Sequence, residues 1–307
     1  MDFREFAKQH SKRIALCEPD KRIVEAARIL VDQGLCTPVF IGDRDDFSQF
    51  GIAVDDIDCI PVDADQFAQR YFELRKHKGI SLEDAQKTLK DPAFFAVMLA
   101  LQGEVHGVVA GATWPTANTI RPALHVLREG FASSAFLMKT SLGDFVFADC
   151  AFNIQPSAEE LSQIGLSAGV LAEKMGFSPR IAMLSFSTIG SASHPDQEKV
   201  MHATAHLKQL LSEQGKDWPV YGEVQLDAAI NPAIGKQKGA GGDANVLVFP
   251  DLNSGNIGYK LVSRFSDSES VGPIMTGFSR PVNDLSRGCT VDEIVDVCCV
   301  TAWQATR

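Results

Sequence analysis

Near the C-terminus the chain reads PVNDLSRGC over residues 281–289, where three chemically capable side chains fall within four positions. Ser286 and Cys289 are candidate nucleophiles, and Arg287 could bind an anion because a guanidinium makes paired, charge-assisted hydrogen bonds to phosphate. An apolar segment follows, so the cluster could also be no more than the start of a last helix. The alternatives are therefore a cysteine nucleophile, a serine nucleophile, a phosphate site or a helix start.

Arg75 and Arg121 are two further arginines in positions that could bind an anion. Arg75 ends a predicted helix in YFELRKHKG, and Arg121 lies in ANTIRPA, directly after a predicted strand. Loops at the carboxyl ends of strands bind ligands in α/β folds, and helix starts, here expected near residues 120 and 290, present free N–H groups. A salt bridge best explains each arginine alone, whereas the three together, with Arg287, favour phosphate.

Other kinds of site lack their motifs. No GxGxxG follows a strand, and GxxxxGK[ST] does not occur, which argues against a dinucleotide site and a P-loop. His202 and His206 stand four apart in HATAH without a glutamate between them, so we expect a solvated helix face and no metal site. The seven cysteines are scattered and form no CxxC pair, which predicts neither a zinc cluster nor a disulfide framework and indicates a reducing cytoplasm.

Strand-like runs alternate with helical patterns along almost the whole chain, which predicts an α/β fold built from parallel βαβ units. The expected strands lie at residues 13–18, 37–42, 105–112, 180–186, 219–224, 244–250 and 271–277. SSAFLMKT and DFVFADCAF are also strand-like, and the turn-forming SLG between them predicts an antiparallel hairpin over residues 133–152. This hairpin is the best candidate for a domain boundary. Ser157 and Glu160 then predict a capping box that begins a long helix.

Composition and net charge limit the classes of molecule that the protein could bind. The 307 residues are 45% hydrophobic, as in an ordinary globular protein, and the net charge of −10 argues against a nucleic-acid partner. An anionic substrate then requires a local positive region. The N-terminus carries charges throughout and has no apolar stretch of signal-peptide length. Gln102, Glu104 and His106 interrupt the most apolar stretch, so no membrane span is expected.

Seven segments spread along nearly the whole chain resemble the phosphate acetyl/butyryl transferase family, and within it the phosphate acetyltransferases. They are YFELRKHKG, GVVAGATWPTANTIRPA, FADCAFNIQPSAEEL, RIAMLSFSTIGSA, GEVQLDAAINP, ANVLVFPDLNSGNIGYKL and PVNDLSRGC. The most specific pieces are SFSTIGSA, FPDLNSGNIGYK and NDLSRGC. The resemblance implies reversible acetyl transfer between acetyl-CoA and inorganic phosphate, giving acetyl phosphate and CoA by direct thiolate attack in a ternary complex. It implies no metal and no tightly bound cofactor, with CoA and acetyl-CoA as substrates.

The resemblance also implies an architecture. We expect two three-layer α/β domains flanking a cleft, similar to the isocitrate and isopropylmalate dehydrogenases. The first would comprise residues 1–130 with residues 275–307, and the second residues 131–274 with the hairpin. Family members are typically homodimers, so the chain is expected to form a homodimer.

Residue roles follow from the same resemblance. Ser286 matches the serine that donates to the developing oxyanion, Arg287 and Arg121 match arginines lining the substrate cleft, and Arg75 matches one linked to CoA and phosphate. Further binding positions by motif match are Arg22 and Lys238 for CoA, and Thr119, Ser191 of the SFSTIGSA turn and Asn283 as polar contacts.

Glu293 is the expected base for the CoA thiol, although the family pattern often has aspartate there. Asp292 precedes it and is the alternative base. Thr290 and Glu293 also fit a capping box, which would explain the carboxylate structurally. A cysteine at a helix start would have a lowered pKa, but no activating histidine is nearby, so we expect Cys289 to be packed.

Two alternatives stay open. A phosphate butyryltransferase would differ only in its acyl pocket, which motifs do not size. A non-catalytic acyl-CoA-sensing domain would bind CoA without turnover, and the intact Ser286–Arg287 pair weighs against it.

Overall fold

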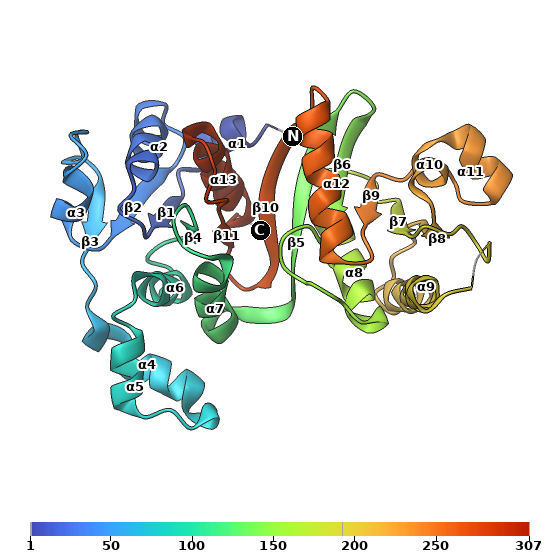
Figure 1. Ribbon diagram of the computed structural model, residues 1–307. Coiled ribbons are helices and arrows are strands. Elements are labelled where there is room, and N and C mark those ends of the chain that lie inside the picture. Colours follow the sequence, from blue (N-terminus) through green and yellow to red (C-terminus); the bar gives the residue numbers. More distant parts are fainter. Residues whose placement is uncertain (1, 192, 307) are drawn as a thin grey trace. The chain divides into compact units, whose positions relative to one another are not determined.

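The computed structural model describes residues 2–191 and 193–306, which divide into two compact units. The terminal unit comprises Asp2–Ala132 together with the described chain from Phe278 onwards, and the central unit comprises Ser133–Gly277. Each unit contains one sheet with helices packed on it (Figure 1). The predicted α/β class is therefore confirmed, with two sheets in which parallel pairing dominates. The predicted domain bounds at 130/131 and 274/275 stay a proposal.

The sheet of the terminal unit has five strands in the order β11-β4-β1-β2-β3, and its neighbouring strands are parallel. They are β1 (Arg13–Leu16), β2 (Thr37–Ile41), β3 (Asp58–Ile60), β4 (Gly107–Ala110) and β11 (Val282–Asp284). Strand β11 comes from the C-terminal part of the chain and pairs with β4. The carboxyl ends of β1, β4 and β11 thus lie next to one another, at the edge where α/β sheets bind ligands.

Helices cover both faces of this sheet. Consecutive residues of a strand point to opposite faces, so two neighbouring residues of β11 contact helices on opposite sides. Asn283 donates to Thr301 of α13, whereas the next residue, Asp284, accepts from Thr116 of α7. The helices of the terminal unit are α1 (Phe3–His10), α2 (Lys21–Asp32), α3 (Arg44–Ser48), α4 (Ala64–Arg75), the 3-10 turn η1 (Lys76–Lys78), α5 (Leu82–Thr88), α6 (Pro92–Gln102), α7 (Thr116–Val126) and α13 (Val291–Gln304).

Helix α6 forms much of the core of the terminal unit. It is apolar nearly all round, and its side chains from residues 93 to 100 are buried. Asp91 caps its first turn and Pro92 occupies the first helical position, where a missing N–H costs no bond. None of the described helices is both long and apolar enough to cross a membrane.

Helix α7 begins at Thr116 rather than near residue 120 as expected. Pro115 precedes the first turn with a φ of −62°, which suits entry into a helix. Pro122 lies inside the helix, where its ring removes one backbone hydrogen bond without ending the helix. Thr119 and Arg121 are consequently helical side chains rather than loop residues.

The sheet of the central unit has six strands in the order β10-β5-β6-β9-β7-β8. Strands β5 and β6 are antiparallel, which confirms the predicted hairpin, and the pairs among β6, β9, β7 and β8 are parallel. The strands are β5 (Arg128–Thr140), β6 (Gly143–Ala148), β7 (Ile181–Leu184), β8 (Val220–Val224), β9 (Val246–Val248) and β10 (Glu269–Phe278).

The helices of the central unit are α8 (Ala158–Lys174), α9 (Pro195–Glu213), α10 (Leu226–Ile230), α11 (Pro232–Lys238) and α12 (Leu252–Phe265). Ser157 and Glu160 form the predicted capping box of α8. Helices α8 and α9 pack together, and His206 of α9 lies 3.0 Å from the Ser162 hydroxyl of α8. The expectation of a solvated histidine pair is therefore right for the exposed His202 and wrong for His206, because helix packing was not visible in the spacing.

Candidate functional site

The segment between β11 and α13 places Ser286 and Arg287 on the surface of the terminal unit. It leaves the sheet after Asp284 and ends at Thr290, the N-cap of α13. Ser286 Oγ accepts a hydrogen bond from the Gly288 N–H at 3.3 Å, which leaves the hydroxyl proton available for donation. Arg287 is exposed and forms no ion pair with any residue of the described chain. Both side chains are thus free to contact a bound molecule.

The loop after β4 is held by a buried carboxylate at the end of β1. Glu18 accepts hydrogen bonds from the N–H groups of Gly111, Ala112, Thr113 and Trp114 at 2.5–3.0 Å. The Thr113 hydroxyl donates to the same carboxylate at 2.6 Å. Since a buried charge is tolerated only when it is well hydrogen-bonded, Glu18 fixes the path of the chain into α7.

Arg22, expected as a CoA contact, is bonded within the terminal unit. Its guanidinium donates to Asp20 and to the backbone carbonyl of Ala112 at 2.9 Å each. It also donates to the carbonyls of Arg287 and Cys289 at 3.0 Å each. The structure therefore joins Arg22 to the Ser286–Arg287 segment through backbone groups.

Asp284 is a site residue that the sequence analysis missed. It is buried at the end of β11, and the Thr116 hydroxyl donates to its Oδ2 at 2.7 Å. The buried Thr119 hydroxyl lies beside this carboxyl. Burial, with a smaller contribution from the charge of Glu18, raises the pKa of Asp284 to about 6. The sequence feature that could have identified Asp284 is its place at the end of a strand, two residues before Ser286.

Replacing Asp284 with asparagine is expected to stabilise the fold at neutral pH. The pKa of this carboxyl is 3.8 ordinarily and about 6 when folded, so ionisation opposes folding. The cost is absent below pH 3.8, grows as the pH rises to 6, and is complete above it. The difference between the two pKa values corresponds to on the order of 3 kcal/mol. Urea unfolding of both proteins at pH 4 and pH 8 measures this change.

The informative quantity is the difference between the two pH values, because any loss of packing in the asparagine variant is common to both. Exposed Asp267→Asn is the control and should change the unfolding free energy by less than ~0.5 kcal/mol at either pH. An Asp284→Asn effect that is the same at pH 4 and pH 8 would contradict the raised pKa.

Arg75 and Arg121 lie near each other around His125, which the sequence analysis also missed. The Tyr71 hydroxyl is 3.0 Å from His125 Nδ1, and the rings of Phe94 and His125 are 5.4 Å apart. Burial lowers the pKa of His125, and the charges of Arg75 and Arg121 lower it further. Neither arginine has an ion-pair partner among the described residues. This is a local positive region in an acidic chain, as an anionic substrate requires.

Two expected contact residues are internal. Asn283 is fully buried, and its amide donates to Thr301 and to Gln304 of α13. Thr119 is also buried, beside Asp284. Asn283 therefore anchors β11 to α13, and the side chain has no exposed surface for a substrate.

Glu293 forms the capping box predicted at the start of α13. Thr290 Oγ1 accepts from the Glu293 N–H at 3.2 Å, and Glu293 Oε2 accepts from the Thr290 N–H at 2.8 Å. Both Glu293 and its neighbour Asp292 are exposed. Asp292 pairs with Arg4 at 3.3 Å. The capping role of Glu293 occupies one of its two oxygens, so it does not by itself exclude proton transfer at the other.

The geometry disfavours Cys289 as a nucleophile. Cys289 is buried as expected, and burial raises the pKa of its thiol to about 11, outweighing the nearby charge of Arg22. The sequence GLSAG at residues 165–169 has the GxSxG pattern of serine hydrolases, but it lies within α8 and not at the strand-to-helix turn that such a nucleophile requires. In the described chain, His, Cys, Asp and Glu form no group of three placed to hold a metal ion.

Ser191 and Lys238 belong to the central unit, where they lie near one another. Ser191 Oγ accepts from the Thr188 N–H at 3.1 Å, and the N–H of Gln225 donates to Thr188 Oγ1 at 3.0 Å. Lys238 Nζ donates to Gln225 Oε1 at 2.8 Å, with Asp227 3.8 Å away. Gln225 thus connects the SFSTIGSA turn to the lysine.

The family model described as "Phosphate acetyl/butaryl transferase" matches residues 2–302. The chain belongs to this family. A phosphate acetyltransferase of Acetivibrio thermocellus is 41% identical over 98% of this chain and 96% of its own length. One of Thermoanaerobacterium thermosaccharolyticum is 42% identical, with 98% and 97% covered. A solved phosphotransacetylase from Streptococcus pyogenes has 39% identity and a TM-score of 0.89, covering 99% of this chain and 97% of its own.

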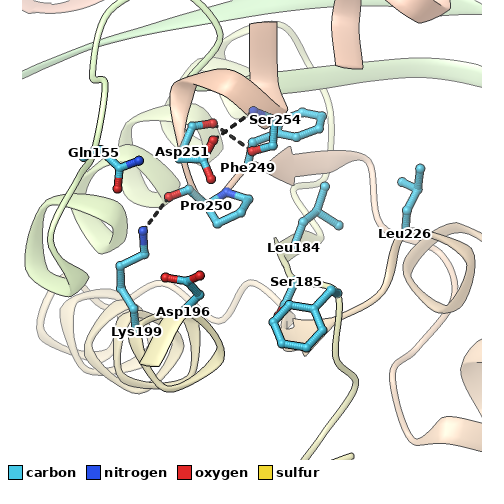
Figure 2. Close-up of a pocket in the computed structure, with 11 residues that line it drawn as sticks. Gln155, Leu184, Ser185, Asp196, Lys199, Leu226, Phe249, Pro250, Asp251 and Ser254 are labelled. Atoms are coloured by element: carbon cyan, nitrogen blue, oxygen red, sulfur yellow. Dashed lines mark hydrogen bonds between the residues drawn. The ribbon is translucent and has the colours of Figure 1, made fainter. Parts of the chain in front are cut away.

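The central unit also has a pocket, at the carboxyl ends of β7 and β9 (Figure 2). Its volume is about 390 Å³. Phe186 and Leu226 line it and are exposed, and Lys199, also in the lining, donates to the Pro250 carbonyl at 2.8 Å. None of the expected site residues lines it.

Proposed function

We propose that the chain is a phosphate acetyltransferase, which transfers an acetyl group reversibly between acetyl-CoA and inorganic phosphate. The observation that carries the proposal is the exposed Ser286–Arg287 pair at the end of β11, in a chain that matches phosphate acetyltransferases along its whole length. CoA, acetyl-CoA, phosphate and acetyl phosphate are the small-molecule substrates, and no tightly bound cofactor is required by the reaction.

In the proposed mechanism the thiolate of CoA attacks the carbonyl carbon of acetyl phosphate. The carbon–sulfur bond forms, the bond from the carbonyl carbon to the phosphate oxygen breaks, and phosphate leaves. Ser286 would donate a hydrogen bond from its hydroxyl to the oxyanion, and Arg287 would balance the charge of the phosphoryl group. Arg75 and Arg121 would bind an anionic part of either substrate, since they have no acidic partner in the described chain.

The thiol proton must leave before attack, because a free thiol with a pKa of about 8.5 is mostly protonated at neutral pH. We assign this step to Glu293, whose exposed carboxylate lies at the start of the helix that follows Arg287. Lys238 and Ser191 of the central unit are proposed as further CoA contacts. Positioning of two anionic substrates would supply much of the rate, because thioester and acyl phosphate are both activated.

The test of the proposed function is phosphate-dependent release of CoA from acetyl-CoA, followed with a thiol reagent. We expect turnover that requires phosphate and yields acetyl phosphate. CoA binding without turnover would instead indicate an acyl-sensing domain. Faster turnover of butyryl-CoA than of acetyl-CoA would indicate a butyryltransferase.

We also propose that two copies of the chain form a dimer through α12. Ile257, Leu261 and Phe265 are four residues apart, lie on one face of this helix, and are 57%, 51% and 85% exposed. Apolar rows of this kind are typical of surfaces that are covered in an assembly. A two-fold contact would bring the same row from both copies together.

Leu261→Asp, in the middle of this row, is expected to convert the dimer to a monomer. A desolvated carboxylate without a partner opposes association more than the loss of one leucine. Sedimentation at micromolar concentration measures the mass, with Leu142→Asp in the exposed turn between β5 and β6 as the control. A wild-type monomer, or a Leu261→Asp dimer, would contradict this interface.

We also propose a cytoplasmic location. The seven cysteines are free thiols and six of them are buried, as in a protein made for a reducing compartment.

A further inference from the structure

All five N–H donors of Arg22 have acceptors inside the terminal unit. Nε bonds to Asp20 at 2.9 Å, and Nη1 bonds to the carbonyls of Arg287 and Cys289 at 3.0 Å each. Nη2 bonds to the carbonyl of Ala112 at 2.9 Å and to the second oxygen of Asp20 at 3.3 Å. A guanidinium has five donors and no acceptor, so this arrangement leaves none for a substrate phosphate.

The carbonyls that Arg22 binds belong to the two loops beside the candidate site. Ser286, Arg287 and Gly288 are exposed, so little side-chain packing holds this segment in one conformation. The Leu285 N–H donates to the Ala110 carbonyl at 2.8 Å and the Cys289 N–H to the Ser286 carbonyl at 2.9 Å, and the two carbonyl bonds to the charged Arg22 add to these. One of these carbonyls is that of Arg287 itself. The bonds from Arg22 therefore help to set the position of the Arg287 backbone and the orientation of the Ser286 hydroxyl.

The second loop is held at both backbone groups of one residue, Ala112. Glu18 accepts from the N–H of Ala112, and Arg22 donates to its carbonyl. The same loop leads to Thr116, whose hydroxyl bonds to Asp284 at the base of the Ser286–Arg287 segment. Arg22 thus joins the loops after β4 and β11, beside the Thr116–Asp284 bond and the backbone bond from the Leu285 N–H to the Ala110 carbonyl.

We infer that Arg22 is a positioning residue for acetyl transfer: it holds the Ser286–Arg287 segment through its carbonyls and does not bind CoA directly. This inference rests on the proposed function for its kinetic consequence, and it departs from the expectation that Arg22 contacts CoA. Small displacements of a charge-stabilising group reduce the rate of the chemical step more than they reduce substrate binding.

The kinetic test compares wild type with Arg22→Ala and Arg22→Lys, using acetyl phosphate with either CoA or dephospho-CoA, which lacks the 3′-phosphate. We expect kcat to fall by about 10- to 100-fold for Arg22→Ala. Arg22→Lys should be intermediate, since one ammonium cannot reach all three carbonyls. The KM for CoA should stay within about twofold, and the preference for CoA over dephospho-CoA should be unchanged. A KM increase at constant kcat, or loss of that preference, would show that Arg22 binds CoA and would overturn the inference.

Arg28→Ala is the matched control. Arg28 lies on the same helix as Arg22, but its guanidinium pairs with Asp32 and Asp56 at 2.8 and 2.6 Å. Its removal should leave kcat and the CoA preference as in wild type. An equal fall of kcat in both variants would assign the effect to α2 as a whole and not to the carbonyl bonds of Arg22.

Amide hydrogen exchange supplies a readout that does not depend on activity. In Arg22→Ala, or in Arg22→Lys should the alanine variant fail to fold, residues 285–290 should exchange faster, whereas the buried helix α6 should exchange as in wild type. Unchanged exchange at 285–290 would overturn the inference even if acetyl transfer is confirmed. If wild type shows no acetyl transfer, the proposed function fails while the exchange result still decides whether Arg22 holds the segment.

Discussion

Replacing Arg287 with alanine is expected to lower phosphate-dependent CoA release from acetyl-CoA by about two to three orders of magnitude. The guanidinium is exposed at the end of β11 and has no acidic partner in the described chain, so it is available to a phosphoryl group. Its charge would be worth most when the acetyl carbon is tetrahedral and negative charge is spread over both substrates. The loss should therefore fall on kcat as well as on the KM for phosphate.

Arg280→Ala is the control for this experiment. Arg280 is an exposed arginine of the same stretch of chain, outside the proposed site, and its loss should leave turnover within about twofold of wild type. Arg287→Lys should recover part of the rate, because it restores the charge without the planar pair of donors. Near-normal turnover of Arg287→Ala would remove Arg287 from the mechanism and, with it, the main structural support for the proposed reaction.

Glu293→Gln is expected to lower kcat for acetyl transfer to CoA by about 10²- to 10⁴-fold, the usual contribution of a general base. Glutamine serves as well as glutamate in a capping box, so the bond to the Thr290 N–H should persist. The variant therefore removes the base and keeps the cap. Equal melting temperatures for the two proteins, measured beside the rates, would show that the helix start is intact.

Asp292→Asn separates Glu293 from its neighbour, the alternative base. Asp292 is exposed and pairs with Arg4, so its loss should leave kcat nearly unchanged. If Asp292→Asn loses activity and Glu293→Gln keeps it, Asp292 is the base and Glu293 is not. If both variants turn over normally, Glu293 is only the N-terminal partner in the cap of α13.

Local patterns predicted much of the fold. The SLG turn between two strand-like runs indicated the β5–β6 hairpin, and the spacing of Ser157 and Glu160 indicated the start of α8. These features are set by neighbouring residues, so the sequence contains all the information they require. The start of α7 was misplaced because Pro115 and Pro122 both mark a boundary in the sequence, and only tertiary packing decides which one the helix continues through.

The candidate site was predictable in residue type and not in contacts. Arg22 was identified as basic, but its bonds to carbonyls 265 and 267 residues away depend on how β11 returns to β4. Asp284 was invisible as a titrating group, since its raised pKa comes from burial that the sequence does not show. His125 was missed for the same reason, because its neighbours Tyr71 and Phe94 come from other helices.

The pairing of β11 with β4 has a consequence for the order of events during synthesis on the ribosome. The strands are separated by the whole central unit, so most of the chain emerges before β11 can join the first sheet. Such long-range pairing forms slowly because a long loop must close first. Ser286 and Arg287 follow β11 directly, so a nascent chain would lack the segment proposed to bind an anion until most of the chain has emerged. Stalled or truncated products would then be inactive without any further control, and the exposed edge of β4 would be the surface that chaperones must protect.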